Sequence, residues 1–135
     1  QEVDVAARHR AAFDLAWRQP GVFGTVGAMS GSFWWRTQDG TTEQKQASRV
    51  ALTMVREATP LPRLRIWLQT ADGDETSDRD GNGVIDSIQD TADLVDALVA
   101  RGYVEGKDVV HVTVEGGHDQ ATWGAALPGF LEWAF

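Results

Sequence analysis

Apolar residues recur along this chain with two spacings, one typical of helices and one typical of buried strands. Short apolar and β-branched runs predict strands at residues 23–29, 64–70 and 109–114. Helical spacing predicts four helices: residues 6–18, residues 43–58, a segment from a cap at Asp86 or Ser87 to Gly102, and residues 122–135. The predicted order therefore alternates helix and strand throughout.

This alternation predicts an α/β fold, a three-layer α/β/α arrangement around a mostly parallel sheet. We expect residues 1–135 to form a single α/β domain or domain fragment. Three strands make a small sheet, and parallel strands are normally buried on both faces. We therefore expect the sheet to continue onto a second copy of the chain or onto a complementing segment supplied from upstream.

Charge is unevenly distributed. The chain has 20 acidic and 12 basic residues, a net charge of −8, and seven of the acids lie within residues 72–90 beside a single arginine. Such a surface repels nucleic acid and anionic membranes, so neither is expected as a partner. No apolar run approaches the length of a membrane span. Without cysteine, the chain has neither disulfides nor thiolate metal sites.

The acidic segment contains a pattern typical of calcium-binding loops, which we expect to be an insertion at residues 72–90. Oxygen-bearing side chains stand at loop positions 1, 3, 5 and 9, with a glycine at position 6 for the sharp turn. Gln89 occupies position 12, where a bidentate glutamate is usual. The sequence therefore predicts a structural calcium ion, or else a solvated acidic loop. The expected ligands are Asp78, Asp80, Asn82, the backbone carbonyl of Val84 and Asp86. Calcium is abundant outside the cell, which favours a secreted or periplasmic location.

Each predicted strand ends in polar residues. Ser30-Gly31-Ser32 follows the first, an acidic cluster follows the second, and Gly116-Gly117-His118-Asp119 follows the third. Ligands of open α/β sheets gather at the carboxyl ends of the strands, so these side chains are expected to converge. An acid followed along the chain by a histidine is also the order found at the end of an α/β-hydrolase triad.

Residues 11–24, residues 28–35 (AMSGSFWW) and residues 116–123 (GGHDQATW) resemble bacterial putative esterases of the enterochelin esterase and esterase D group. The resemblance covers nearly the whole chain but only the second half of that fold. It implies hydrolysis of carboxylic esters by acyl transfer, with a small-molecule ester as substrate. It also implies that His118 is the general base and that the acid lies after the second strand. We expect Asp74 to be this acid, with Asp72 and Glu75 as alternatives.

One family feature is missing from this sequence. Family members carry Gly-x-Ser-x-Gly before the first helix, whereas this chain has Ala6 near the serine position and Arg8 and His9 where glycine is expected. Alanine cannot attack a carbonyl. The sequence alone therefore leaves two functions open. One is an ester hydrolase whose nucleophile is absent from this chain, and the other is a non-catalytic, calcium-stabilised α/β binding or structural module.

Overall fold

The computed structural model describes the backbone of residues 5–135 and the side chains of residues 11–135. Three parallel strands form one sheet in the order β1-β2-β3: β1 is Thr25–Met29, β2 is Arg65–Gly73 and β3 is Val109–Gly117. The helices are α1 (Val5–Arg18), α2 (Thr42–Ala47), α3 (Val50–Glu57), α4 (Asp86–Ala100) and α5 (Gln120–Ala134). The predicted α/β fold with a parallel sheet is confirmed.

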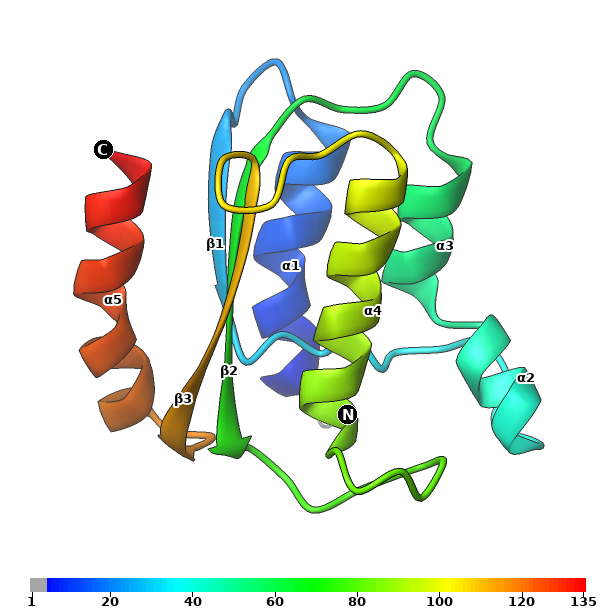
Figure 1. The fold of residues 1–135 in the computed structure, drawn as a ribbon. Helices are drawn as coiled ribbons and strands as arrows, with labels where there is room; N and C mark the ends of the chain where they lie inside the picture. Colours follow the sequence, from blue (N-terminus) through cyan, green and yellow to red (C-terminus); the bar gives the residue numbers. More distant parts are fainter. Residues whose placement is uncertain (1–4) are drawn as a thin grey trace.

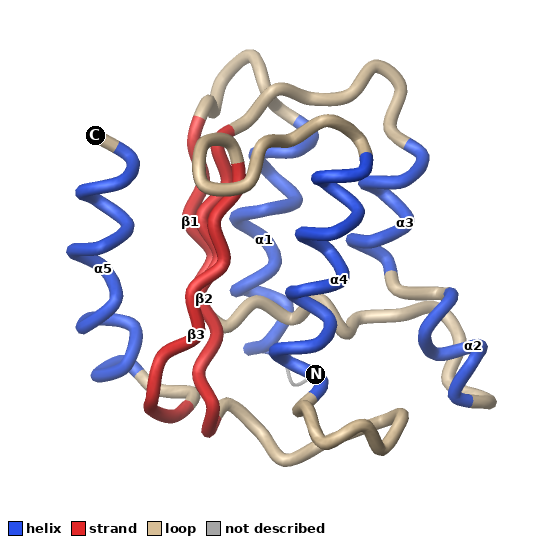
Figure 2. The backbone as a smooth tube through the Cα atoms, viewed as in Figure 1, coloured by secondary structure: helices blue, strands red, loops and turns tan. Residues whose placement is uncertain are grey.

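Helices cover both faces of the sheet (Figure 1). Helix α1 packs on β1, and α4 packs on β2 and β3 on the same side. Helix α5 lies by itself against the other face, and α3 packs outside α4 (Figure 2). No helix in the described part of the chain is long and apolar enough to span a membrane.

The main core lies between the sheet and helices α1 and α4. Phe13, Ile66, Leu68 and Leu98 are fully buried there. The other face is held by a smaller set of contacts, chiefly Trp67 against Phe130 with ring centroids 5.6 Å apart. Because α5 has no fully buried residue, most of its apolar surface is only partly covered.

The single helix predicted over residues 43–58 is wrong, because the chain forms α2 and α3 with a break at Ser48 and Arg49. Arg49 has an extended backbone (φ −62°, ψ 122°), and its backbone forms an isolated antiparallel β-bridge with that of Arg36. The amide of Val50 donates to the carbonyl of Trp35. Apolar spacing continues across the break, so the pattern could not reveal a tertiary contact that interrupts the helix.

The predicted cap of α4 is also wrong. The N-cap is Ile85, with no side-chain cap bond. Asp86 instead accepts a bond from the amide of Arg79, and Ser87 donates its hydroxyl to Asp74. The side chains of both predicted caps are therefore bonded to partners outside the helix. Pro128 does not break α5, which continues past it to Ala134.

Candidate active site

Three polar residues each stand directly after a strand, at the same edge of the sheet. Ser30 follows β1, Asp74 follows β2 and His118 follows β3. The arrowheads of β2 and β3 meet at this edge in Figure 1. Parallel strands run in the same direction, so their carboxyl ends bring three residues that are far apart in the chain close together.

Asp74 and His118 are in contact, with Nδ1 of His118 3.3 Å from Oδ1 of Asp74. The Asp74 side chain is 2% exposed, whereas that of His118 is 38% exposed. The acid is thus held inside the protein and the imidazole reaches solvent. This is the arrangement expected of an acid that orients a catalytic histidine.

Local backbone structure brings the two residues together. The register of β2 and β3 shifts between Ala71 and Gly73, where Gly73 comes opposite Gly117. A Cβ atom on Gly73 would lie 2.5 Å from the carbonyl oxygen of Gly116, too close for any other residue. Glycine at this position therefore lets the strand ends approach closely just before Asp74 and His118.

The Asp74 carboxylate is surrounded by donors. Its Oδ1 accepts from Ser30 Oγ over 2.7 Å, in addition to the His118 contact. Its Oδ2 accepts from Ser87 Oγ over 2.8 Å and from the amide of Ala71 over 2.9 Å. A carboxylate can accept about four such bonds, so the orientation of Asp74 is fixed.

The two alternative acids make different contacts. Asp72 accepts from the amide of Gly116, and Glu75 accepts from the amide of Ser87 over 2.6 Å. Burial is the largest effect on Glu75 and raises its pKa above the ordinary value, although the Ser87 bond opposes the rise. Asp74 is the acid that the fold places against His118.

A small open cavity of about 200 Å³ lies beside the pair. Its lining includes Ser30, Ser32, Trp34, Asp74, Glu75 and His118. Trp34 lines this cavity, and Trp35 stacks on Trp34 with ring centroids 6.5 Å apart. The site thus combines acidic, hydroxyl and aromatic groups in a concave surface, as binding sites for small molecules commonly do.

The start of α5 positions His118. Asp119 caps the helix by accepting from the amide of Thr122 over 2.8 Å, which lowers the pKa of Asp119 below its ordinary value. The ring of Trp123, one turn later, meets the His118 imidazole edge to face, with centroids 5.1 Å apart. His118 is therefore held between a strand end, a helix cap and an aromatic ring.

This arrangement can support general base chemistry. When Nδ1 donates to a carboxylate, the second ring nitrogen, Nε2, carries a lone pair and can accept a proton. The hydroxyls of Ser30 and Ser87 are engaged by Asp74 and so are poorly disposed to be nucleophiles. The Ala6 side chain lies outside the described residues, as do those of Arg8 and His9.

The acidic loop is folded with its own hydrogen bonds. The backbone nitrogen of Asn82 lies 3.2 Å from both Asp78 Oδ1 and Asp80 Oδ1, so these two carboxylates converge on one N–H group. Gly83 has the φ of +87° that the turn needs, and its amide donates to Asp78.

The fifth predicted ligand behaves differently. Asp86 accepts from the amide of Arg79, and its other oxygen lies 3.3 Å from the Arg79 guanidinium. The side chain of Gln89 accepts from Asn82. Within the described residues, no group of three or more histidine, aspartate or glutamate side chains is placed to hold a metal ion. Three of the predicted ligands therefore gather at the loop, while Asp86 is paired with the protein's own arginine.

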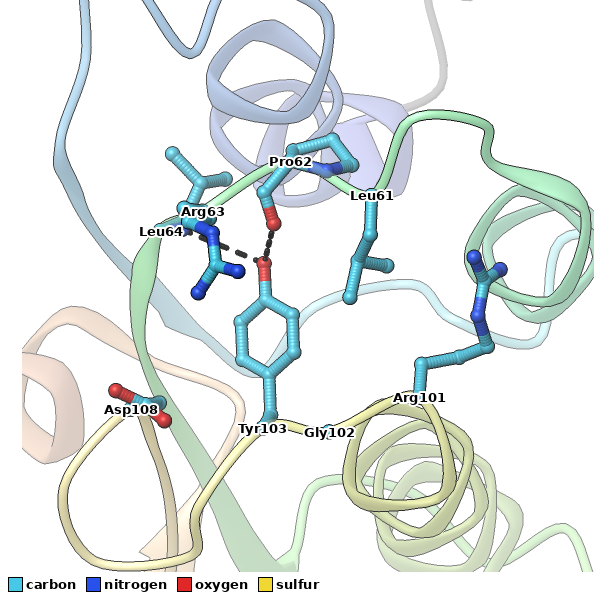
Figure 3. A pocket seen from close by; sticks show the side chains of 8 residues that line it. All are labelled: Leu61, Pro62, Arg63, Leu64, Arg101, Gly102, Tyr103 and Asp108. Atoms are coloured by element: carbon cyan, nitrogen blue, oxygen red, sulfur yellow. Dashed lines mark hydrogen bonds between the residues drawn. The ribbon is translucent and has the colours of Figure 1, made fainter.

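A second cavity, of about 190 Å³, lies at the opposite end of the sheet, where β2 and β3 begin (Figure 3). Tyr103 dominates it, donating to the carbonyl of Pro62 and accepting from the amide of Leu64. Arg101 donates to carbonyls at the end of α3, including those of Val55 and Ala58. The polar groups of Tyr103 and Arg101 are thus hydrogen-bonded to backbone groups of the protein. We therefore interpret this cavity as a packing junction between connecting segments.

Sequence reasoning missed parts of the site. Ser87 was predicted as a possible helix cap, yet its hydroxyl donates to Asp74. Trp123 had no predicted role in the site, yet it donates to Ser30 and its ring contacts that of His118. One available signal was the position of Trp123, one turn into the helix that follows His118. Nothing in the local sequence distinguishes Ser87 from an ordinary cap.

Solved structures that share this fold include three esterases. An enterochelin esterase from Shigella flexneri is 24% identical with a TM-score of 0.58, over 86% of this chain and 25% of that chain. An enterobactin esterase from Shigella flexneri, solved in the presence of enterobactin, is 21% identical with a TM-score of 0.58. The match covers 93% of this chain and 28% of that chain. A ferulic acid esterase is 18% identical with a TM-score of 0.59, over 88% and 44%. This chain therefore spans less than half the length of each of these structures.

No curated protein sequence matches the chain. The sequence profile described as putative esterase matches residues 10–134, which is nearly the whole chain and includes every strand and both members of the Asp74–His118 pair. The chain belongs to the putative esterase family.

Proposed function

We propose that this chain supplies the acid and the general base of a carboxylic-ester hydrolase. The observation that carries the proposal is the 3.3 Å contact between Nδ1 of exposed His118 and the buried carboxylate of Asp74. Membership of the putative esterase family and the fold shared with esterases agree with this role.

In this proposal Asp74 holds the imidazole of His118 with its Nδ1 proton toward the carboxylate. The Nε2 atom then takes the proton of the attacking hydroxyl and later returns it to the leaving alcohol. Asp74 stabilises the imidazolium that forms between these two steps. The cavity beside Trp34 would hold part of the ester.

The nucleophile comes from outside this sequence in our proposal. The chain has no Gly-x-Ser-x-Gly, and the hydroxyls of Ser30 and Ser87 are bonded to Asp74. A complementing segment placed along the outer edge of β1 would extend the sheet and could bring a serine to Nε2 of His118. A small-molecule ester is the proposed substrate, of the kind that the names of the enterochelin and ferulic acid esterases indicate.

Complementation tests this function. The chain would be combined, in trans and as a fusion, with the upstream part of a family member that carries the Gly-x-Ser-x-Gly serine. Association would be checked by light scattering and hydrolysis followed with p-nitrophenyl acetate. We expect hydrolysis that falls by about 10²-fold or more in His118→Gln, as for loss of a general base.

Two controls accompany this assay. The upstream part alone measures background, and Ser48→Ala, a change outside the cavity lining, should match the unmodified chain. Activity that survives both His118→Gln and Asp74→Asn would overturn the proposal.

A second candidate function is a calcium-stabilised module, and the convergence of Asp78 and Asp80 on the amide of Asn82 favours it. We propose that calcium binds at Asp78, Asp80, Asn82 and the carbonyl of Val84. Asp86 is a weaker candidate because Arg79 engages it. This role is compatible with the first, since the proposed insertion of residues 72–90 carries both Asp74 and the loop.

A further inference from the structure

A chain of two hydrogen bonds leads from helix α5 to the acid. Trp123 Nε1 donates to Ser30 Oγ over 3.0 Å, and Ser30 Oγ donates to Asp74 Oδ1 over 2.7 Å. An indole N–H can only donate, so Ser30 must accept from it. The single hydroxyl proton of Ser30 is then directed at Asp74. The chemistry of Trp123 thus fixes the direction of both bonds.

The same tryptophan also contacts the base. Its ring meets the His118 imidazole at an interplanar angle of 86°, with centroids 5.1 Å apart. Edge-to-face pairs of this kind are favourable and restrict ring rotation. Trp123 therefore touches the imidazole directly and reaches the carboxylate through Ser30.

Ser30 adopts a backbone conformation that is unfavourable for a residue with a side chain. Its φ of +48° is in the left-handed region, which costs a residue other than glycine about 1 kcal/mol or more. It is 3% exposed, and its amide also donates to the carbonyl of Gln69 over 2.7 Å. A strained residue persists where its surroundings fix it, and here the two side-chain bonds supply a reason for serine rather than glycine.

We propose that Ser30 and Trp123 are positioning residues that fix the Asp74 carboxylate and the His118 ring in the geometry needed for proton transfer. This inference rests on the proposed function, since it assigns the two residues a task in the same site. Neither residue is the nucleophile or the base.

The test follows the tautomer of His118 by ¹⁵N NMR of the imidazole, in the full chain, at a pH where the ring is neutral. We expect the Nδ1–H form to dominate in the unmodified chain. Ser30→Gly and Trp123→Phe should each shift the tautomer ratio toward Nε2–H by about two- to ten-fold, the factor that one hydrogen bond contributes.

The variants separate positioning from stability. Ser30→Gly relieves the left-handed backbone, so its melting temperature should equal or exceed that of Ser30→Ala while the tautomer shift remains. Trp133→Phe is the matched control, because it removes another indole donor from α5, the one bonded to the carbonyl of Gly106. It should leave the tautomer ratio unchanged.

Asp74→Ala distinguishes failure of the proposed function from failure of the positioning proposal. If Asp74→Ala leaves the tautomer ratio unchanged, the acid–base pair itself fails and the proposed function fails with it. If Asp74→Ala shifts the ratio but Ser30→Gly and Trp123→Phe do not, only the positioning proposal is overturned. An equal shift in Trp133→Phe would also overturn it, because the effect would then be general.

Discussion

The guanidinium of Arg79 binds both carboxylate oxygens of Asp90, with Nη2 2.6 Å from Oδ1 and Nη1 3.2 Å from Oδ2. The two side chains are only 5% and 1% exposed. Arg49 places its own Nη1 2.7 Å from the same Oδ1. Asp90 therefore ties three elements together: the acidic loop through Arg79, the start of α3 through Arg49, and its own helix α4.

Replacing Asp90 should destabilise the fold strongly. Asp90→Ala leaves two buried guanidinium groups without their shared carboxylate, and breaking a buried ion pair costs about 3–5 kcal/mol. Asp93 and Asp86 still pair with the two arginines, so we expect the lower end of that range. Urea denaturation followed by circular dichroism gives the free energy of unfolding.

Asp96, exposed on the same helix, supplies the control. Asp96→Ala should change the free energy of unfolding by less than about 0.5 kcal/mol. Equal effects of the two substitutions would contradict the structural role of Asp90.

Glu75→Gln should raise stability at neutral pH. Burial raises the pKa of Glu75 from its ordinary value of 4.5, so the folded protein holds this proton more tightly than the unfolded chain. The stability that protonated Glu75 contributes is therefore fully present below pH 4.5 and is lost as the pH rises through the folded-state pKa. Glutamine keeps an oxygen to accept from the Ser87 amide but carries no charge.

The difference between Glu75→Gln and the unmodified chain should therefore grow with pH and then level off. Thermal melts from pH 4 to pH 8 measure it. A constant difference across this range would show that burial does not disfavour the charged form of Glu75.

His111 should give a pH dependence in the other direction. Burial lowers the pKa of His111 below the ordinary value of 6.5, and its Nε2 lies 2.9 Å from Thr70 Oγ1. The unfolded chain then binds the proton more readily, so stability falls as pH drops below 6.5 toward the folded-state pKa. Melts of His111→Gln should show a weaker loss over this window, and an identical loss would refute the assignment to His111.

Calcium should stabilise the chain if the acidic loop binds it. A ligand that binds only the folded state adds about 2.7 kcal/mol when its concentration is about 100 times the dissociation constant. We expect the melting temperature to rise with calcium and to return to the starting value with chelator. The double variant Asp78→Asn, Asp80→Asn should lose this response, whereas Asp96→Asn should keep it. A melt unaffected by calcium would eliminate this site.

The alternation of helices and strands was predictable because each buried element carries its own apolar spacing. The strand at residues 64–70 corresponds to β2, and the convergence of polar residues at the strand ends follows from parallel strand direction alone. The break at Arg49 was not predictable, because the contacts that cause it come from Arg36, Trp35 and Asp90.

The sequence by itself therefore determined the fold class, the edge of the sheet where polar residues gather, and the place of His118 in the loop that follows the last strand. Only the tertiary structure decided which acid meets His118, because Asp72, Asp74 and Glu75 are near neighbours whose directions depend on the register shift at Gly73. It also decided that Asp86 pairs with Arg79 and that Trp123 reaches Ser30. Side-chain direction depends on contacts between distant segments, and no local pattern records those contacts.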